Sequence, residues 1–227
     1  YTTDHYSSGY SSIIASHCKD YNPTDGIYEN DYLYWKYDSR KILATRGNKV
    51  LMHNANVVML SVDGGVTFPY TKSVASFSAS ACFGYIWENG NLSFATRSKI
   101  YSSTDNLATV NEVIPTGIDG NPFVATTDAY YDVNGADYMY VGGTEVKVWG
   151  TYSTVSPTQF NNIDVWISDD AGVSIKSIFR FGVTLPAYSC RHVHSVTQNP
   201  DDESFIMNTG DGQFGCNWFR CVYDINT

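Results

Sequence analysis

The stretch Ser61-Val62-Asp63-Gly64-Gly65-Val66-Thr67-Phe68 recurs, with changes, as Ser168-Asp169-Asp170-Ala171-Gly172-Val173-Ser174-Ile175. Each copy follows a short apolar or aromatic run, at residues 57–60 and 165–167. A turn that recurs behind similar strands indicates a chain assembled from copies of one supersecondary unit. The sequence therefore predicts a repeat architecture.

The residue types of this phrase suit a tight reversal between two strands. The side-chain oxygens of Ser61 and Asp63 can accept hydrogen bonds from backbone N–H groups further along the turn. Gly65 can adopt a positive φ without the steric cost of a Cβ atom. Phe68 and Ile175 then restart an apolar strand. We therefore expect the aspartates of this phrase to be structural residues of outer turns, without a catalytic role.

Two weaker copies of the phrase lie at residues 103–110 and 222–227. The first keeps Ser103 and Asp105 but has no glycine, and the second keeps Asp224. The aspartates recur at intervals of roughly 40 to 65 residues, which suits one four-stranded sheet with variable loops per repeat. These are the dimensions of a propeller blade.

The repeated phrase resembles the motif Ser/Thr-x-Asp-x-Gly-x-x-aromatic of the Asp-box, or BNR, repeat β-propellers, which are typified by sialidases. The copy at 61–68 matches in full, and the copy at 168–175 departs at its last position. The resemblance covers residues 45–227 and implies structural roles for Ser61, Asp63, Gly65, Phe68, Ser103, Asp105, Ser168, Asp170 and Gly172. Such propellers include glycosidases, polysaccharide lyases, lectins and scaffolds, so the resemblance indicates a fold more than an activity.

The composition favours an all-β protein. The chain has 18 Tyr, 11 Phe, 5 Trp and 18 Gly, and 16% of its residues are charged. Aromatic residues favour strands, and no amphipathic helix of useful length is evident. Strands are predicted at residues 49–60, 81–86, 92–101, 138–141, 146–151, 163–168, 175–181, 192–197, 204–208 and 218–223.

The length of 227 residues corresponds to four or five blades of about 50 residues each. We expect residues 1–227 to form one segment of a six- or seven-bladed propeller in a longer chain, with a small four-bladed ring as the alternative. Residues 1–46 fit the blade pattern worst and are expected to form an early blade with a long loop at 20–29.

Charge and cysteine content limit the partners. A net charge of −9 disfavours binding to nucleic acid, and no apolar run is long enough to insert into a membrane. None of the five cysteines lies in a Cys-x-x-Cys pair, which disfavours a zinc ribbon, and buried thiols are favoured over a local disulfide. The resemblance implies an extracellular or surface location, virion surfaces included, with a glycan as ligand and other subunits of a larger assembly as further partners.

The strongest candidates for chemistry are Arg191, His192 and His194. On a strand, the two histidines point to one face and Arg191 to the other. Two adjacent imidazoles can divide acid and base roles near neutral pH, or hold a divalent metal such as Zn²⁺ together with a third ligand. The alternative is that both histidines are hydrogen-bonded between blades and only orient the following turn.

Several other residues are weaker candidates for substrate binding or catalysis. We expect the strand of the histidine pair to line the central channel of the propeller, and His53 to face the same channel. His53, Trp149 and Trp218 are then expected to contact substrate, since indoles can stack on sugar rings. An arginine clamp for a carboxylate and free acid/base carboxylates are further possibilities, although structural roles are favoured for each. The clamp would use Arg46, Arg97, Arg180 or Arg191, and the carboxylates are Glu145 and Asp164. Trp87 is a further indole that could stack on a sugar ring.

The sialidase family places an arginine in a Phe/Tyr-Arg-Ile-Pro motif, which this sequence lacks; Phe179-Arg180-Phe181-Gly182 comes nearest. We therefore do not predict a sialidase. Three classes remain: a glycosidase or lyase acting on acidic polysaccharide, a non-catalytic glycan-binding or adhesion propeller of a surface or phage tail, and a scaffold. Propeller ulvan lyases, similar only in fold, use histidine and tyrosine to remove the C5 proton while arginine neutralises the uronate, and His192, His194 and Arg191 are of these types.

Overall fold

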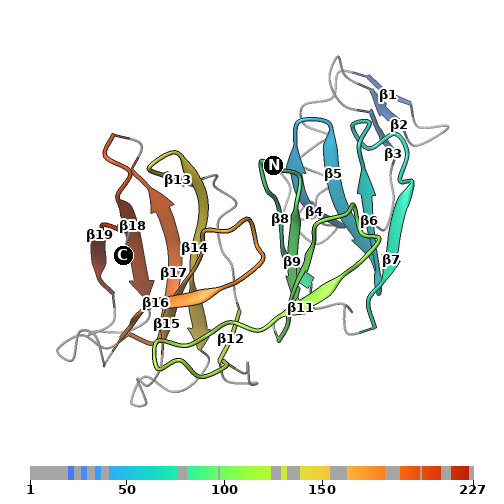
Figure 1. Cartoon of the computed structure of the whole chain (residues 1–227). Coiled ribbons are helices and arrows are strands. Elements are labelled where there is room, and N and C mark those ends of the chain that lie inside the picture. The colour runs from blue at the N-terminus through green and yellow to red at the C-terminus, as the bar shows by residue number, and fades with distance from the viewer. Residues whose placement is uncertain are drawn as a thin grey trace.

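A computed structural model gives the fold, and every regular element in the part of the chain that it describes is a β-strand. The described residues are 20–22, 27–29, 34–36, 41–75, 81–96, 98–123, 129–131, 139–153, 163–181, 190–199, 201–210 and 216–224. The strands form five antiparallel sheets (Figure 1). The all-β prediction is confirmed.

The sheets follow one another along the chain. The first contains β1 (Asp20–Asn22), β2 (Ile27–Glu29) and β3 (Tyr34–Lys36). The second contains β4 (Lys41–Arg46), β5 (Lys49–Asn54), β6 (Val57–Ser61) and β7 (Tyr70–Ser73), and the third β8 (Ala81–Ile86), β9 (Leu92–Thr96), β10 (Ile100–Ser103) and β11 (Asn111–Val113). The fourth contains β12 (Ala129–Tyr131), β13 (Met139–Val141), β14 (Thr144–Ser153), β15 (Asp164–Ser168) and β16 (Lys176–Arg180), and the fifth β17 (His192–Gln198), β18 (Phe205–Gly210) and β19 (Trp218–Cys221).

Each sheet is a meander in which consecutive strands pair. The order is β4-β5-β6-β7 in the second sheet and β11-β10-β9-β8 in the third, while β12 and β13 both pair with β14 in the fourth. Four-stranded antiparallel meanders repeated along a chain are the blades of a β-propeller, which is the predicted fold. How many blades complete the ring stays a prediction.

Three details differ from the sequence-based predictions. The run 49–60, predicted as one strand, is a hairpin of β5 and β6 that turns at Ala55, whose φ is 48°. The run 92–101 likewise divides into β9 and the beginning of β10. The expected loop at 20–29 instead contains β1 and β2, whose central pair is Tyr21↔Tyr28. No glycine lies within residues 49–60 or 92–101, so each of these two runs looked like one continuous strand.

The core lies between successive sheets. One buried cluster, which includes Leu51, Leu60 and Phe94, joins the second and third sheets. A second, which includes Phe83, Trp149 and Trp166, joins the third and fourth, and a third, which includes Val148, Val193 and Phe205, joins the fourth and fifth. Blade-on-blade packing of this kind buries both faces of the inner sheets.

Two glycines allow neighbouring blades to approach closely. A Cβ on Gly84 of β8 would lie 2.5 Å from Leu43 Cβ of β4, and a Cβ on Gly150 of β14 would lie 2.2 Å from Val193 Cβ of β17. Both distances are too short for carbon atoms in contact. The inner strands therefore need glycine at these two positions to pack at the observed spacing.

The repeated phrase forms the same hydrogen-bonded turn between the third and fourth strands of a blade. Ser61 Oγ accepts from Gly65 N at 2.8 Å, and Asp63 Oδ1 accepts from Thr67 N at 2.9 Å. The same pair of bonds recurs in the next blade, from Leu107 N to Ser103 Oγ and from Thr109 N to Asp105 Oδ1, and in the fourth sheet, from Gly172 N to Ser168 Oγ and from Ser174 N to Asp170 Oδ1. Residues 225–227 of the last expected copy lie outside the described residues.

Leu107 occupies the position of Gly65 at a φ of 70°, against 92° for the glycine. The left-handed backbone of this turn therefore persists where the sequence has no glycine. The side chains that close the turns point inward: Ile175 is buried between the third and fourth sheets, and Phe68 packs on Val50, Met52 and Met59.

We expect the carboxyl group of Asp63 to titrate with a midpoint of about 2 in the folded protein. Hydrogen bonds from Ser61 and Thr67 lower its pKa from 3.8 to about 2. Because the folded pKa lies below the unfolded value, the turn's contribution to stability is fully present above pH 4 and is lost as the pH falls toward 2. A ¹³C NMR titration of the carboxyl carbon measures the midpoint. A midpoint near 4 would contradict the hydrogen-bonded turn.

Candidate functional site

The fifth sheet carries the histidine pair and an exposed tryptophan on one face. His192 of β17 pairs with Gly210 of β18, and Asn208 of β18 pairs with Trp218 of β19. Directly opposed residues in an antiparallel sheet share a face, and so do residues two apart on one strand. His192 and Trp218 therefore project from the same face, near the same end of the sheet.

The two histidine rings lie against each other. His192 Nε2 and His194 Nε2 are 3.3 Å apart, and the ring planes are inclined by 77°. One ring donates and the other accepts, which requires one imidazole with its proton on Nε2 and one without. The prediction that the two side chains share a side of the strand agrees with this contact.

His192 is fixed from the neighbouring blade. Its ring stacks on that of Tyr152 of β14, with centroids 4.1 Å apart and planes 9° from parallel, and its side chain has no exposed surface. His194 is half-buried. His192 is thus an interblade residue that can orient its partner, while His194 is the member of the pair that solvent and solutes can reach.

A bulge and a glycine place His194. The pairing of β17 with β18 shifts register between Val193 and Ser195, so His194 is the extra residue. A Cβ on Gly210 would lie 1.7 Å from His194 Nε2, so the imidazole occupies the space above this glycine. Bulges of this kind redirect side chains near functional sites.

Trp218 is the most exposed large aromatic side chain among those described. Its exposed fraction is 74%, equal to that of Val222 just beyond the end of β19. Trp218 lies two strands from β17, a distance of about 10 Å. Tryptophan is highly buried on average, so an exposed indole on the same sheet as a reachable imidazole is a candidate platform for a ring-shaped ligand.

Two of the residues expected to contact substrate are buried. Trp149 is buried in the core between the third and fourth sheets, and His53 is buried at the end of β5, where its Nδ1 lies 3.3 Å from the Ala55 carbonyl oxygen. Burial lowers the pKa of His53, and the bond to Ala55 opposes this in part. Trp87 is also buried and donates to Ser93 Oγ. Strand periodicity alone does not distinguish such core aromatics from platform aromatics.

Arg46 and Glu145 form an ion pair where the ends of three blades meet. Arg46 Nη1 donates to Glu145 Oε1 at 2.5 Å and to the Ile86 carbonyl at 3.1 Å, and its Nη2 donates to the Tyr140 hydroxyl at 3.0 Å. Tyr85 and the backbone N–H of Glu88 also donate to Glu145. Burial lowers the pKa of Arg46, but the hydrogen bonds and charges of Glu145 and Tyr140 together raise it, so its net pKa lies above its ordinary value.

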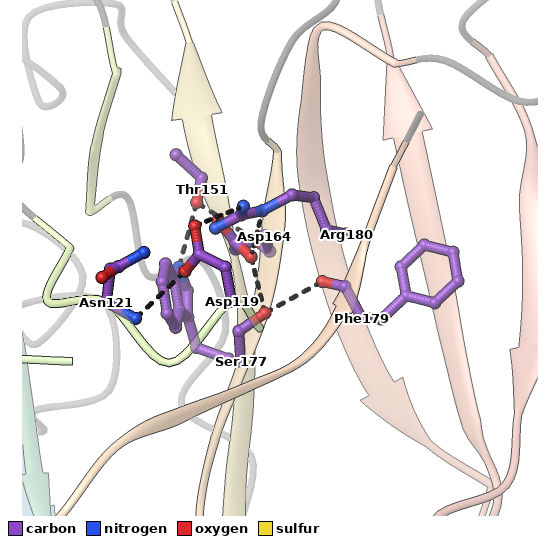
Figure 2. A network of polar contacts seen from close by, with 8 residues as sticks. Asp119, Asn121, Thr151, Asp164, Ser177, Phe179 and Arg180 are labelled. Carbon is purple, nitrogen blue, oxygen red and sulfur yellow. Dashed lines mark hydrogen bonds and ion pairs between the residues drawn. The ribbon is translucent and has the colours of Figure 1, made fainter. Parts of the chain in front are cut away.

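Arg180 and Asp164 form a second internal pair (Figure 2). Arg180 grips both carboxylate oxygens of Asp164, at 2.9 and 3.0 Å, and Ser177 Oγ donates to Asp164 Oδ1 at 2.6 Å. The hydrogen bond and charge of Asp164 raise the pKa of Arg180. Asp164 is therefore an ion-pair partner within the fold and not a free acid. Arg97 lies outside the described residues, and Arg191 is half-buried.

Three of the five cysteines are thiols in the structure. Cys190, Cys216 and Cys221 are free, and burial raises the pKa of Cys190 to about 12. A disulfide between Cys216 and Cys221 is therefore not formed. Among the described residues, no cluster of three or more His, Cys, Asp or Glu side chains could hold a metal ion, and no helix is long and apolar enough to cross a membrane.

Comparison with known proteins finds no matching family model and no matching curated protein. Among solved structures, YCF48 bound to D1 peptide is 11% identical with a TM-score of 0.29, and the match covers 81% of this chain and 76% of that one. A catalytically inactive virginiamycin B lyase from Staphylococcus aureus with quinupristin is 17% identical with a TM-score of 0.31, covering 81% and 70%. We draw no conclusion about ligand or activity from these likenesses.

Proposed function

We propose that this propeller binds an extracellular glycan on the face of the fifth sheet that carries His194 and Trp218. The observation that supports the proposal is the position of an exposed indole and a reachable imidazole on one face, about two strand spacings apart. A sugar ring can stack on the indole while the next unit of the chain reaches the imidazole.

We further propose that the recurring turns are Asp-box turns. The bonds from the serine hydroxyl and the aspartate carboxylate to backbone N–H groups, repeated in three sheets, support this assignment. The turns lie at the opposite end of each blade from the histidines, because the third strand of a meander ends where the first strand ends. On this proposal they stabilise the blades and take no part in the chemistry.

The histidine pair suits elimination from an acidic polysaccharide. His194 removes the C5 proton of a uronate, the resulting electron pair forms the C4–C5 double bond, and the C4–O bond breaks. The departing oxygen takes up a proton from water, His194 returns the C5 proton to solvent, and the product is an unsaturated uronate. His192, held by Tyr152, positions His194 and fixes which nitrogen carries the proton.

To test this, the protein is incubated with a panel of uronate polysaccharides, and the absorbance of the unsaturated product is measured over time. We expect wild type to form product on one member of the panel, and H194A to lose the activity while keeping its melting temperature. Thr197→Ala, an exposed change further along β17, is the matched control and should keep full activity. Equal rates for wild type and H194A would remove His194 from the chemistry.

The second candidate is a glycan-binding propeller without catalysis. The complete burial of His192 favours it, because a buried imidazole cannot touch a polymer and leaves His194 as one reachable group. On this alternative the panel gives no absorbance change, yet the protein is retained on a glycan array through Trp218.

A further inference from the structure

We propose that Arg220 selects acidic sugars on the face of the fifth sheet that carries His194 and Trp218, a role that rests on the proposed function. The guanidinium binds the carboxylate of a uronate whose ring stacks on the indole. Trp218 and Arg220 are two residues apart on β19, and they lie opposite Asn208 and Ile206 of β18. Both side chains therefore project from the same face of the sheet, with their Cα atoms about 7 Å apart.

The alternation of exposure along β19 agrees with this geometry. The exposed fraction is 74% for Trp218 and 58% for the side chain of Arg220. Phe219 and Cys221, which alternate with them, pack instead against the buried cluster between the fourth and fifth sheets. β19 is the outer strand of the order β17-β18-β19 (Figure 1). The indole and the guanidinium are therefore both open to a ligand that lies along this strand.

The charge of this sheet is concentrated at Arg220, which is the only Lys, Arg, Asp or Glu residue on β17, β18 and β19. Because the whole chain carries a net charge of −9, an anionic glycan needs a locally basic position at which to bind. A guanidinium presents a planar fork of N–H donors that matches a carboxylate through two parallel hydrogen bonds. The face therefore favours a uronate over a neutral sugar.

Asp202 is an internal competitor for the same guanidinium. Arg220 Nη2 donates to Asp202 Oδ2 at 2.7 Å, and this bond uses one of the five N–H donors of the arginine. Asp202 Oδ1 accepts from the Ser204 backbone N–H at 2.9 Å, which holds the carboxylate at the turn between β17 and β18. Both side chains of the pair are exposed, and exposed ion pairs are weak. A glycan carboxylate can therefore displace Asp202 at little cost.

The experiment titrates the whole chain, by calorimetry, with oligosaccharides of polygalacturonate, alginate and hyaluronan and with the carboxyl-reduced form of each. Reduction keeps the sugar backbone and removes the charge. For an oligosaccharide that binds, we expect wild type to prefer the acidic form by at least about tenfold, as for hydrogen bonds to a charged group. Arg220→Gln should lose this preference and keep the affinity for the reduced form, because Trp218 is unchanged.

Lys99→Gln is the matched control, because it also removes one positive charge from an exposed ion pair with a 2.7 Å contact, but in the third sheet. It should keep the acidic preference. Asp202→Asn removes the competing charge and keeps a side-chain oxygen for the Ser204 N–H. It should bind the acidic form up to about fivefold more tightly than wild type does. Circular dichroism checks the folding of each variant.

The outcomes separate this role of Arg220 from the proposed function. Equal affinities of wild type for the acidic and reduced forms, or an acidic preference that Arg220→Gln retains, would overturn the role of Arg220 while glycan binding stands. An affinity for the acidic form that Asp202→Asn leaves unchanged would overturn the competition by Asp202. Absence of binding by wild type to every oligosaccharide would overturn the proposed function, and the role of Arg220 with it.

Discussion

Replacing Asp164 with alanine is expected to lower the free energy of unfolding by about 3–5 kcal/mol. The Asp164 side chain has no exposed surface and that of Arg180 is only 12% exposed, so the variant leaves a guanidinium buried without its bidentate partner. Ser177 Oγ loses its shorter hydrogen bond at the same time and keeps the Phe179 carbonyl oxygen at 3.2 Å (Figure 2). Urea unfolding followed by circular dichroism measures the difference.

Asp119 offers a matched control on the same arginine. It contacts Arg180 Nη1 at 3.3 Å, but its side chain is 48% exposed. Exposed ion pairs contribute about 0–1 kcal/mol, so D119A should be nearly neutral. Equal losses for the two variants would show that burial of Asp164 does not set the strength of this network.

Arg46→Ala is expected to lower the free energy of unfolding by about 3 kcal/mol, the lower end of the range for a broken buried pair. Arg46 comes from the second sheet, the Ile86 carbonyl from the third, and Glu145 and Tyr140 from the fourth. The variant leaves a nearly buried Glu145 with Tyr85 and the Glu88 N–H as donors but no opposing guanidinium. The loss therefore reports on the contact among three blades.

The exposed pair Lys99–Glu112 is the control for Arg46, because its two atoms are 2.7 Å apart within one blade and both side chains are substantially exposed. Lys99→Ala should cost less than about 1 kcal/mol. If Arg46→Ala costs no more than Lys99→Ala in the same urea titration, the three blades are not joined at this end.

The fold could be predicted because its signal is local and repeated. Ser61, Asp63 and Gly65 carry the turn within five residues, and the same chemistry returns after the third strand of the next blade, with Leu107 in place of glycine. The predicted strand boundaries were wrong where a turn lacked the usual glycine or proline, as at Ala55. A short polar turn between two apolar runs gives only a weak sequence signal, so the two runs are predicted as one strand.

The candidate site was harder to predict because its parts come from separate blades. That the two histidines contact each other follows from their spacing on one strand, but their fixing by Tyr152 depends on packing between the fourth and fifth sheets. Periodicity could not distinguish Trp218 from Trp149, since both lie on strands and differ only in what covers them. Likewise Arg46 and Glu145 meet across the blades, far apart in sequence.

The central claim is that a glycan binds on the face of the fifth sheet, and titration of intrinsic tryptophan fluorescence with uronate oligosaccharides tests it most directly. Trp218 is exposed while Trp87, Trp149 and Trp166 are buried, so a change in emission and in acrylamide quenching on binding comes chiefly from Trp218 among these four. We predict saturable binding by wild type and an affinity reduced more than about tenfold, or about 1.4 kcal/mol, in W218A. Equal affinities for wild type and W218A, or no saturable binding by wild type to any member of the panel, would contradict the claim.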